Sequence, residues 1–331
     1  MAKVAINGMG RIGRAAFKII LDTPGLELKA VNDLMALDNL AYLLKYDTVY
    51  GRYGKKVSAG GNNLMVDGKM YQYLSVKDPA SLPWKDLGID IVFECTGLFT
   101  NVEGMNKHIQ AGAKFAILSA PPKGGEVCCI VHGVTTPPEG DRVLSCASCT
   151  TNCITPVVEV IGRRIGVKKA IMTTIHAYTS TQAIVDGPAK KFRRGRAGAA
   201  NLVPTSTGAA VATTDTLPQY KGKFDGVAVR VPVPNGSLAD IVFVTERPTT
   251  VDEVNGILRE EAQGRYKGIL GVAEDEIVSS DIIGDSRASI VDPYMTQVVD
   301  GDLVKVMTWY DNEWGYTNQM IREAVRLAKG L

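Results

Sequence analysis

Hydrophobic segments of two kinds follow one another along the first third of the chain. The apolar run KVAIN (3–7) predicts a short strand, and LELKAVND (26–33) predicts a second one. Between them, the segment RAAFKIILDTP (14–24) places Ala16, Phe17, Ile20 and Leu21 on one side of a predicted helix. This succession indicates a parallel strand–helix–strand unit, the building block of a doubly wound sheet.

The same patterns continue beyond this unit. Apolar, β-branched runs predict further strands, and a long helix-forming run begins at Cys149. The predicted strands are 89–97, 114–121, 143–148, 167–179 and 226–235; the predicted helices are 149–166 and one that begins near Thr207 within 204–217. The first half therefore favours an α/β fold of the Rossmann type, with a doubly wound parallel sheet.

A glycine-rich turn, GMGRIG (8–13), separates the first strand from the first helix. Gly8 allows the tight turn, Gly10 lets the backbone approach a pyrophosphate, and Gly13 lets the helix pack close to the strand. The N–H groups at the start of the helix are then available to phosphate oxygens. A glycine pattern in this setting predicts a dinucleotide site.

Asp33 ends the second strand, 20 residues after Gly13. Its carboxylate can accept hydrogen bonds from an adenosine ribose and repels a 2′-phosphate, and the residues that follow, Leu34 and Met35, offer no arginine. The expected cofactor is therefore NAD rather than NADP. Further candidate neighbours of the cofactor, some of which serve equally well as turn residues, are Lys77, Thr96, Gly97 and Ser119.

Composition excludes several classes of protein. The 37 Lys and Arg residues nearly balance the 35 Asp and Glu residues, so overall charge favours neither nucleic acid nor a membrane surface. No apolar run is long enough to span a membrane, and the start, MAKVAINGMG, lacks a signal peptide's hydrophobic region. The six cysteines match neither a disulfide framework nor a metal site, so we expect a cytoplasmic protein without a metal.

Cys149 and His176 are the candidate catalytic pair. The segment LSCASCTTNCITP (144–156) places Cys149 at the start of a predicted helix, where the helix dipole and unpaired N–H groups favour a thiolate and an oxyanion. The next strand ends near His176, one of only three histidines. A strand, a cysteine helix and a histidine strand in succession predict that thiol and imidazole meet at one end of the sheet.

Hydroxyl groups and arginines gather in the same half and suggest two anion sites. Arg230 lies in an apolar strand and needs an anionic partner if it is buried. Thr207 and Gly208 precede a predicted helix, a place where anions bind. The other candidates are Ser148, Thr150, Thr179 and the basic loop KKFRRGR (190–196), whose charges equally suit a solvated surface, a subunit contact or nonspecific RNA binding.

These residues closely resemble the phosphorylating, NAD-dependent glyceraldehyde-3-phosphate dehydrogenase family. The likeness runs nearly end to end, through INGMGRIGR, SAPPK, ASCTTNC, TTIHAYTSTQ, VPTSTGAA, VRVPVPN and WYDNEWGY. The resemblance implies oxidation and phosphorylation of D-glyceraldehyde 3-phosphate to 1,3-bisphosphoglycerate by NAD⁺ and inorganic phosphate, through thiohemiacetal and thioacyl intermediates. It also implies a cytoplasmic homotetramer without a specific nucleic acid partner.

The resemblance assigns roles to individual residues. It implies that Cys149 is the nucleophile and His176 its base. It also implies that Thr179 and Arg230 bind the substrate's C3 phosphate. The implied binding site for inorganic phosphate consists of Ser148, Thr150, Thr207 and Gly208, with Arg194 nearby. It places the cofactor against Arg11, Ile12, Asp33, Lys77 and Ser119, with Asn312 on the nicotinamide carboxamide and Tyr316 near the ring.

The resemblance also predicts the organisation of the chain. Residues 1–148 would form the NAD-binding Rossmann domain, completed by a C-terminal helix within 312–331. Residues 149–311 would form an α+β catalytic domain with a mixed or antiparallel sheet, including an S-shaped loop, 178–203, that reaches a neighbouring subunit. Pro188 matches the NAD-using members.

Several positions depart from the family pattern, among them the paired Cys128 and Cys129 on a predicted strand. Met9 stands where Phe is usual, and Cys146 stands where Asn is usual, which puts local positioning and resistance to oxidation in doubt. Gly236 replaces a β-branched residue and is expected to loosen a strand.

Three alternative functions stay open on the sequence. The first is erythrose-4-phosphate dehydrogenase, a relative that hydrolyses the thioester; the presence of Thr179, Thr207 and Gly208 argues against it. The second is an RNA-binding role of the basic loop, and the third is redox sensing through Cys146 and Cys149.

Overall fold

The computed structural model describes residues 1–124 and 127–331, which divide into two compact units. The first unit contains residues 1–132, 136–147 and 317–331, and the second contains residues 133–135 and 148–316. The chain thus leaves the first unit directly before Ser148 and returns to it at Thr317. Each unit has its own sheet and hydrophobic core.

The first unit is built on a nine-stranded sheet with the strand order β10-β11-β9-β8-β1-β2-β7-β6-β5. All pairs from β10 to β7 are parallel, and β7, β6 and β5 form an antiparallel meander at the edge. The strands are β1 (Ala2–Asn7), β2 (Leu26–Asn32), β5 (Val57–Gly60), β6 (Asn63–Val66), β7 (Lys69–Leu74), β8 (Ile91–Glu94), β9 (Phe115–Leu118), β10 (Cys128–Cys129) and β11 (Val143–Ser145).

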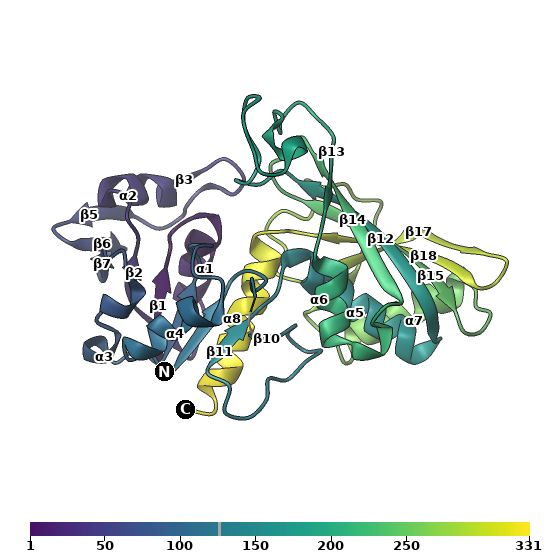
Figure 1. Ribbon diagram of the computed structural model, residues 1–331, viewed down its shortest axis with the longest axis horizontal. Helices are drawn as coiled ribbons and strands as arrows, with labels where there is room; N and C mark the ends of the chain where they lie inside the picture. The colour runs from purple at the N-terminus through teal and green to yellow at the C-terminus, as the bar shows by residue number, and fades with distance from the viewer. Residues whose placement is uncertain (125–126) are drawn as a thin grey trace. The chain divides into compact units, whose positions relative to one another are not determined.

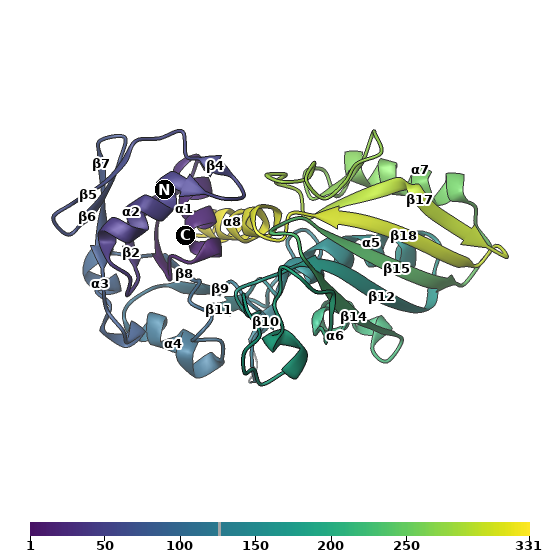
Figure 2. The same cartoon turned by 90° about the horizontal axis from the view of Figure 1, so that it is seen from above.

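Helices cover both faces of this sheet, with α1 and α8 on one side and α4 on the other (Figures 1 and 2). The helices are α1 (Arg11–Leu21), α2 (Leu37–Lys45), α3 (Trp84–Leu87), α4 (Val102–Gln110), the short η1 (Pro79–Ser81) and α8 (Trp314–Ala328); a two-stranded ribbon joins β3 (Tyr46–Asp47) to β4 (Gly51–Arg52). This arrangement confirms the predicted Rossmann-type α/β fold.

The second unit has a seven-stranded mixed sheet with the order β13-β14-β12-β15-β18-β17-β16. Its strands are β12 (Val167–Ala177), β13 (Val203–Ser206), β14 (Phe224–Val231), β15 (Ser237–Thr245), β16 (Leu270–Val272), β17 (Ser289–Val299) and β18 (Leu303–Tyr310). Helices α5 (Cys149–Arg164), α6 (Ala209–Thr216) and α7 (Val251–Gln263) lie on one face (Figure 1), and η2 (Phe192–Gly195) and η3 (Pro218–Tyr220) are short turns. The mixed sheet with helices confirms the α+β prediction.

Several elements begin or end at other residues than predicted. The strand predicted over 89–97 ends at Glu94, because the Glu94 carboxylate accepts the N–H of Thr96 and Gly97 adopts a φ of +71°. The strand predicted over 143–148 ends at Ser145, and Ala147 adopts a φ of +52°. The first helix begins at Arg11 rather than at Arg14, immediately after Gly10.

Candidate active site

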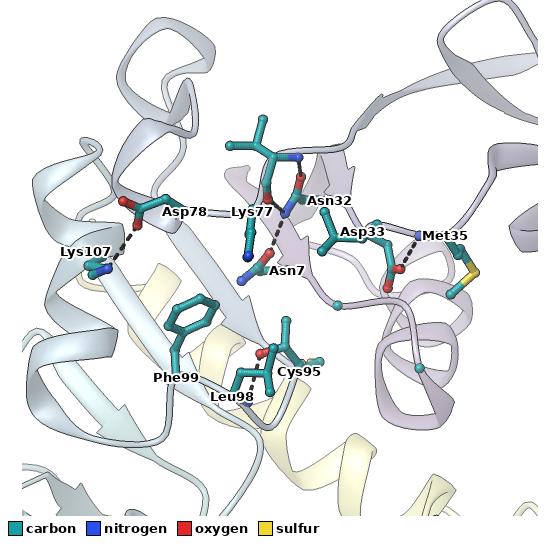
Figure 3. A pocket seen from close by; sticks show the side chains of 15 residues that line it. Asn7, Asn32, Asp33, Met35, Lys77, Asp78, Cys95, Leu98, Phe99 and Lys107 are labelled. Atoms are coloured by element: carbon teal, nitrogen blue, oxygen red, sulfur yellow. Dashed lines mark hydrogen bonds and ion pairs between the residues drawn. The ribbon is translucent and has the colours of Figure 1, made fainter.

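A cavity of about 590 Å³ lies at the carboxyl ends of the parallel strands in the first unit (Figure 3). Ligands bind at this edge of open α/β sheets, where consecutive crossovers leave a crevice. The lining residues are Asn7, Gly8, Gly10, Asn32, Asp33, Leu34, Met35, Val76, Lys77, Asp78, Cys95, Thr96, Leu98, Phe99 and Lys107. The volume falls within the range of ligand pockets and suits the adenosine half of a dinucleotide.

The glycine-rich turn at this cavity tolerates only glycine at two positions. Gly8 has a φ of +94°, and a β-carbon there would lie 2.6 Å from the backbone nitrogen of Thr96. A β-carbon on Gly13 would lie 1.9 Å from the carbonyl oxygen of Gly8. The first turn of helix α1 therefore packs closely against the glycine-rich segment before it. This close packing is needed for backbone N–H groups to surround a phosphate.

Asp33 stands at the same edge with its carboxylate held in place. One oxygen accepts the N–H of Met9 at 2.6 Å, and the other accepts the N–H of Met35 at 2.9 Å. The exposed apolar side chains of Leu34 and Leu98 also line the cavity. A carboxylate held in place and apolar side chains in the same cavity fit a ribose and a flat base.

The predicted cofactor residues do not all reach this cavity. Among the described residues, its lining includes Gly8, Gly10, Asp33, Lys77 and Thr96, whereas Arg11, Ile12, Gly13, Gly97 and Ser119 lie outside it. Arg11 forms an ion pair with Asp47, at 2.6 Å between Nη1 and Oδ2. Ser119 follows β9 and forms a hydrogen bond with the thiol of Cys95.

Several lining residues escaped the sequence analysis. Asn7 and Asn32 are the last residues of β1 and β2, so their place at strand ends was a signal that could have been used. Asp78, Phe99 and Lys107 carry no such signal. Lys107 lies 3.1 Å from the Asp78 carboxylate and 5.8 Å from the centre of the Phe99 ring, and these contacts join a loop to α4.

In the second unit, Cys149 is the first residue of α5 and faces His176 near the end of β12. The Cys149 Sγ and His176 Nε2 atoms are 3.4 Å apart. Ser148 caps the helix, and its hydroxyl oxygen accepts the N–H of Thr151 at 3.0 Å. His176 Nδ1 lies 2.7 Å from the carbonyl oxygen of Ala177, and a proton donated there leaves Nε2 able to accept the thiol proton.

Burial opposes charge on both members of this pair. Burial raises the pKa of the Cys149 thiol, although the Arg230 charge and hydrogen bonds from Thr150 and the helix N-terminus act in the opposite direction. Burial, followed by the charges of Arg230 and Arg194, lowers the pKa of His176 to about 3. The effect of the helix N-terminus, which favours a thiolate, is therefore outweighed by burial, which favours the neutral forms of both the thiol and the imidazole.

Arg230 lies on β14 directly beside His176, its register partner on β12. Its Nη1 atom donates to the carbonyl oxygen of Ala177 at 3.0 Å and also contacts His176 Nδ1. Its Nε atom is buried, and no described residue bonds to it. A half-buried guanidinium with a donor left over is prepared to receive an anion.

The other predicted phosphate residues lie on neighbouring loops and helix ends. Arg194, in η2, donates to the Thr205 hydroxyl at 3.1 Å, and its charge is one of those that lower the pKa of His176. The hydroxyls of Thr179 and Thr181 are 2.9 Å apart. Gly208 caps α6, and the Thr207 hydroxyl oxygen accepts the N–H of Ala209 at 3.2 Å.

Thr150 differs from the other hydroxyl residues because its side chain points into the unit. Its hydroxyl is 2.9 Å from the hydroxyl of Tyr310, which is in turn 2.7 Å from that of Thr174. The Tyr310 ring lies edge-on to His176, with 5.9 Å between ring centres. Thr150 thus joins a buried network beneath the pair, and sequence reasoning missed Tyr310 altogether.

The expectation that Gly236 loosens a strand is wrong, because Gly236 lies before β15 and not within it. It precedes β15, is buried, has a φ of +89°, and a β-carbon there would lie 2.3 Å from the carbonyl oxygen of Ser279. Its N–H donates to Asn312 Oδ1 at 3.1 Å, and the Ser237 hydroxyl donates to the same oxygen at 2.9 Å. Asn312 is therefore held with its oxygen occupied, and the buried Tyr316 follows it in α8.

The other departures are packing positions. Met9 is fully buried, and Cys146 is buried at the end of the β11 region. Burial raises the pKa of the Cys146 thiol well above its usual value, which makes it a poor nucleophile. Cys153, one turn beyond Cys149, is fully buried as well, and none of the six cysteines forms a disulfide bond.

A cavity at the strand ends of a doubly wound sheet in one unit is typical of an NAD-dependent oxidoreductase, and the other unit holds a thiol–imidazole contact whose thiol is partly buried. Comparison with known proteins agrees. Residues 2–102 match the NAD-binding domain of glyceraldehyde 3-phosphate dehydrogenase, and residues 148–312 match its C-terminal domain. The chain belongs to the glyceraldehyde-3-phosphate dehydrogenase family.

Curated relatives match along almost the whole chain. A glyceraldehyde-3-phosphate dehydrogenase of Geobacillus stearothermophilus is 47% identical over 99% of both chains, and one of Zymomonas mobilis is 45% identical over 99% of both. One of Streptomyces coelicolor is 48% identical over 96% of both. None of the helices in the described residues is long and apolar enough to cross a membrane, and no cluster of His, Cys, Asp and Glu among them could hold a metal ion.

Proposed function

We propose that this chain oxidises D-glyceraldehyde 3-phosphate to 1,3-bisphosphoglycerate with NAD⁺ and inorganic phosphate, through a covalent acyl-cysteine. The observation that carries the proposal is the 3.4 Å contact between Cys149 Sγ and His176 Nε2 at the N-terminus of α5, beside an arginine with a buried, unsatisfied donor. A thiol, a base and an anion-binding group together supply a nucleophile, a proton acceptor and a place for the substrate's phosphate.

In the first step, His176 Nε2 takes the thiol proton while the Cys149 sulfur attacks the aldehyde carbon. A carbon–sulfur bond forms, and the electron pair of the carbonyl bond moves to oxygen. Backbone N–H groups at the N-terminus of α5 stabilise that oxygen, and the imidazolium returns the proton to it. The product is a thiohemiacetal whose phosphate pairs with Arg230 and Thr179.

In the second step, His176 takes the hydroxyl proton of the thiohemiacetal as hydride leaves the carbon. NAD, when bound, supplies the hydride acceptor. Before substrate binds, burial and two arginine charges lower the pKa of His176 to about 3, so its imidazole is neutral and its lone pair is free to accept this proton. A thioester on Cys149 results.

In the third step, an oxygen of inorganic phosphate attacks the thioester carbon. The carbon–sulfur bond breaks, and the proton on His176 returns to the leaving sulfur. Ser148, Thr150, Thr207, Gly208 and Arg194 are the proposed phosphate site; of these, Gly208 presents the start of α6. Because the hydroxyl of Thr150 bonds to Tyr310, we assign its backbone N–H to this site rather than its side chain.

Turnover with and without inorganic phosphate tests the proposal against hydrolysis of the thioester. We expect NADH formation from glyceraldehyde 3-phosphate to require phosphate, with arsenate able to replace it. Multiple turnovers without either anion, or a preference for erythrose 4-phosphate, would favour the erythrose-4-phosphate dehydrogenase alternative. NADP in parallel assays checks the cofactor preference.

We further propose that the chain forms a homotetramer in the cytoplasm. On the face of the second unit's sheet that its helices leave open, Ile171, Val227, Val299 and Leu303 are between 40% and 62% exposed. The loop 178–203 exposes Ile184, Val185 and Phe192 as well. Apolar surface of this extent favours contact with further copies of this chain. The proposed location rests on a different observation: the six cysteines form no disulfide bond, which suits a reducing compartment. Sedimentation should give the mass of four 35.5 kDa chains; a monomer would overturn the assembly but not the chemistry.

A further inference from the structure

Three polar residues form a row across the end of the central strands in the first unit. Asn7, Asn32 and Glu94 are the last residues of β1, β2 and β8, and Asn7 is the direct register partner of both others. Asn7 and Asn32 also line the nucleotide cavity (Figure 3). All three are nearly or fully buried, so their hydrogen-bonding groups must be satisfied inside the protein.

Glu94 is a fully buried carboxylate that has no capacity left for a ligand. Its Oε2 atom accepts from Asn7 Nδ2 at 2.6 Å and lies 3.0 Å from His108 Nε2. Its Oε1 atom accepts the backbone N–H of Thr96 at 2.8 Å and also the Thr96 hydroxyl. Four donors match the four lone-pair positions of a carboxylate, so Glu94 acts on its neighbours and not on the cofactor.

The partner of Glu94 in α4, His108, is fixed in one tautomer by a tryptophan. The Trp84 Nε1–H donates to His108 Nδ1 at 3.1 Å. Because an indole N–H can only donate, Nδ1 must carry a lone pair, and the ring proton must be on Nε2, facing Glu94. His108 is fully buried and lies outside the cavity lining.

The direction of donation continues from Glu94 into the cavity. Since a carboxylate only accepts, the amide nitrogen of Asn7 must face it, which turns the Asn7 oxygen toward Asn32. Asn32 Nδ2 donates to that oxygen at 2.7 Å and to the carbonyl oxygen of Val76 at 2.9 Å, while Asn32 Oδ1 accepts the Val76 N–H at 2.9 Å. Flipping either amide would set oxygen against oxygen.

We propose that Trp84, His108 and Glu94 are positioning residues for NAD, which orient the Asn7 and Asn32 amides at the cavity floor and hold the Thr96 turn against Gly8. The second part follows from the close approach of the two segments, because the backbone nitrogen of Thr96 lies only 2.6 Å from the position that a β-carbon on Gly8 would take. Losing the His108 donor leaves Glu94 buried with an unmet lone pair and frees it to pull Asn7 or Thr96 out of place.

The experiment compares three variants of the full chain. His108→Leu removes the donor to Glu94, His108→Gln keeps an N–H at a comparable reach, and Met105→Ala opens a cavity on the same helix at a buried residue outside the row. By calorimetry, His108→Leu should weaken NAD binding by about tenfold or more, as expected for one orphaned buried acceptor. His108→Gln and Met105→Ala should stay within about threefold of the parent chain.

Two controls separate positioning from general damage. At saturating NAD, the kcat of His108→Leu and the alkylation rate of Cys149 should be unchanged, so the loss appears in NAD affinity and in the KM for NAD alone. The proposal is overturned if His108→Leu binds NAD as the parent does, or if Met105→Ala weakens binding equally. Because NAD affinity is the readout, failure here would leave the thiol chemistry proposed above untouched.

A second measurement on the parent chain does not depend on how the variants fold. With only three histidines, nitrogen-15 NMR can assign the imidazole of His108 by comparison with His132 and His176 variants. We expect the Nε2-protonated tautomer at neutral pH. A proton on Nδ1 would contradict the Trp84 bond and with it the direction of the whole row.

Discussion

The polar groups at the strand ends beside the nucleotide cavity satisfy one another, whereas the arginine beside the Cys149–His176 pair keeps one donor unused. Nearly every side-chain donor and acceptor of Glu94, Asn7 and Asn32 forms a hydrogen bond with another group of the first unit. In the second unit, Arg230 keeps a buried Nε without a partner, and burial disfavours charge on both Cys149 and His176. The first site is therefore held in one arrangement by its own hydrogen bonds, whereas the second has a charged group that the proposed anionic substrate could neutralise.

The largest effect is expected from a substitution that disables the site in the second unit and leaves the nucleotide cavity of the first unit intact. Cys149→Ser should lower turnover by about 10³-fold or more, because a serine hydroxyl is a far weaker nucleophile beside a base of low pKa. The affinity for NAD, measured by calorimetry, should not change. Turnover above a tenth of the parent value would refute the role of the thiol.

Removing the base should have the next largest effect. His176→Asn should lower kcat by about 10²- to 10⁴-fold, since the imidazole nitrogen 3.4 Å from the Cys149 sulfur is the proposed acceptor of the thiol proton. In the parent chain, the raised pKa of Cys149 and the pKa of about 3 for His176 predict that alkylation by iodoacetamide keeps accelerating as pH rises through neutrality. A rate already level below pH 7 would instead indicate a preformed thiolate.

Arg230 sharpens the comparison because it acts on both substrate and thiol. Arg230→Gln should raise the KM for glyceraldehyde 3-phosphate by about tenfold to a hundredfold, and change the KM for unphosphorylated glyceraldehyde far less. Since the Arg230 charge lowers the pKa of Cys149, its loss should move the alkylation profile to higher pH. Arg196→Gln, an exposed arginine paired with Asp186, is the matched control.

The smallest effect is expected from a substitution that disturbs only the nucleotide cavity of the first unit. Asp33→Ala should weaken NAD binding by about tenfold, because the carboxylate and its two backbone bonds to Met9 and Met35 are lost. NADP should lose less than NAD, and the alkylation rate of Cys149 should stay constant. Asp38→Ala, at an exposed acid nearby, should change none of these values.

Sequence reasoning identified the elements that local patterns encode. The helix start at Cys149 and the strand near His176 lie where they were predicted, because helix and strand periodicity depends on neighbouring residues. Asp33 lies one residue beyond β2, and the predicted GMGRIG turn is shorter than expected because α1 already begins at Arg11. Where strands end was less accessible. Glu94 stops β8 through a side-chain bond to Thr96, which no periodicity reveals.

By itself, then, the sequence determined the two-part fold, the family and the residue types able to do the chemistry. Only the tertiary structure decided that Arg230 lies against His176, that the hydroxyl of Thr150 turns inward to Tyr310, and that Asn7, Asn32 and Glu94 form one row. The physical reason is that these contacts depend on the register between strands far apart in the chain, and that burial, which sets the proton affinities of Cys149 and His176, belongs to the packed fold.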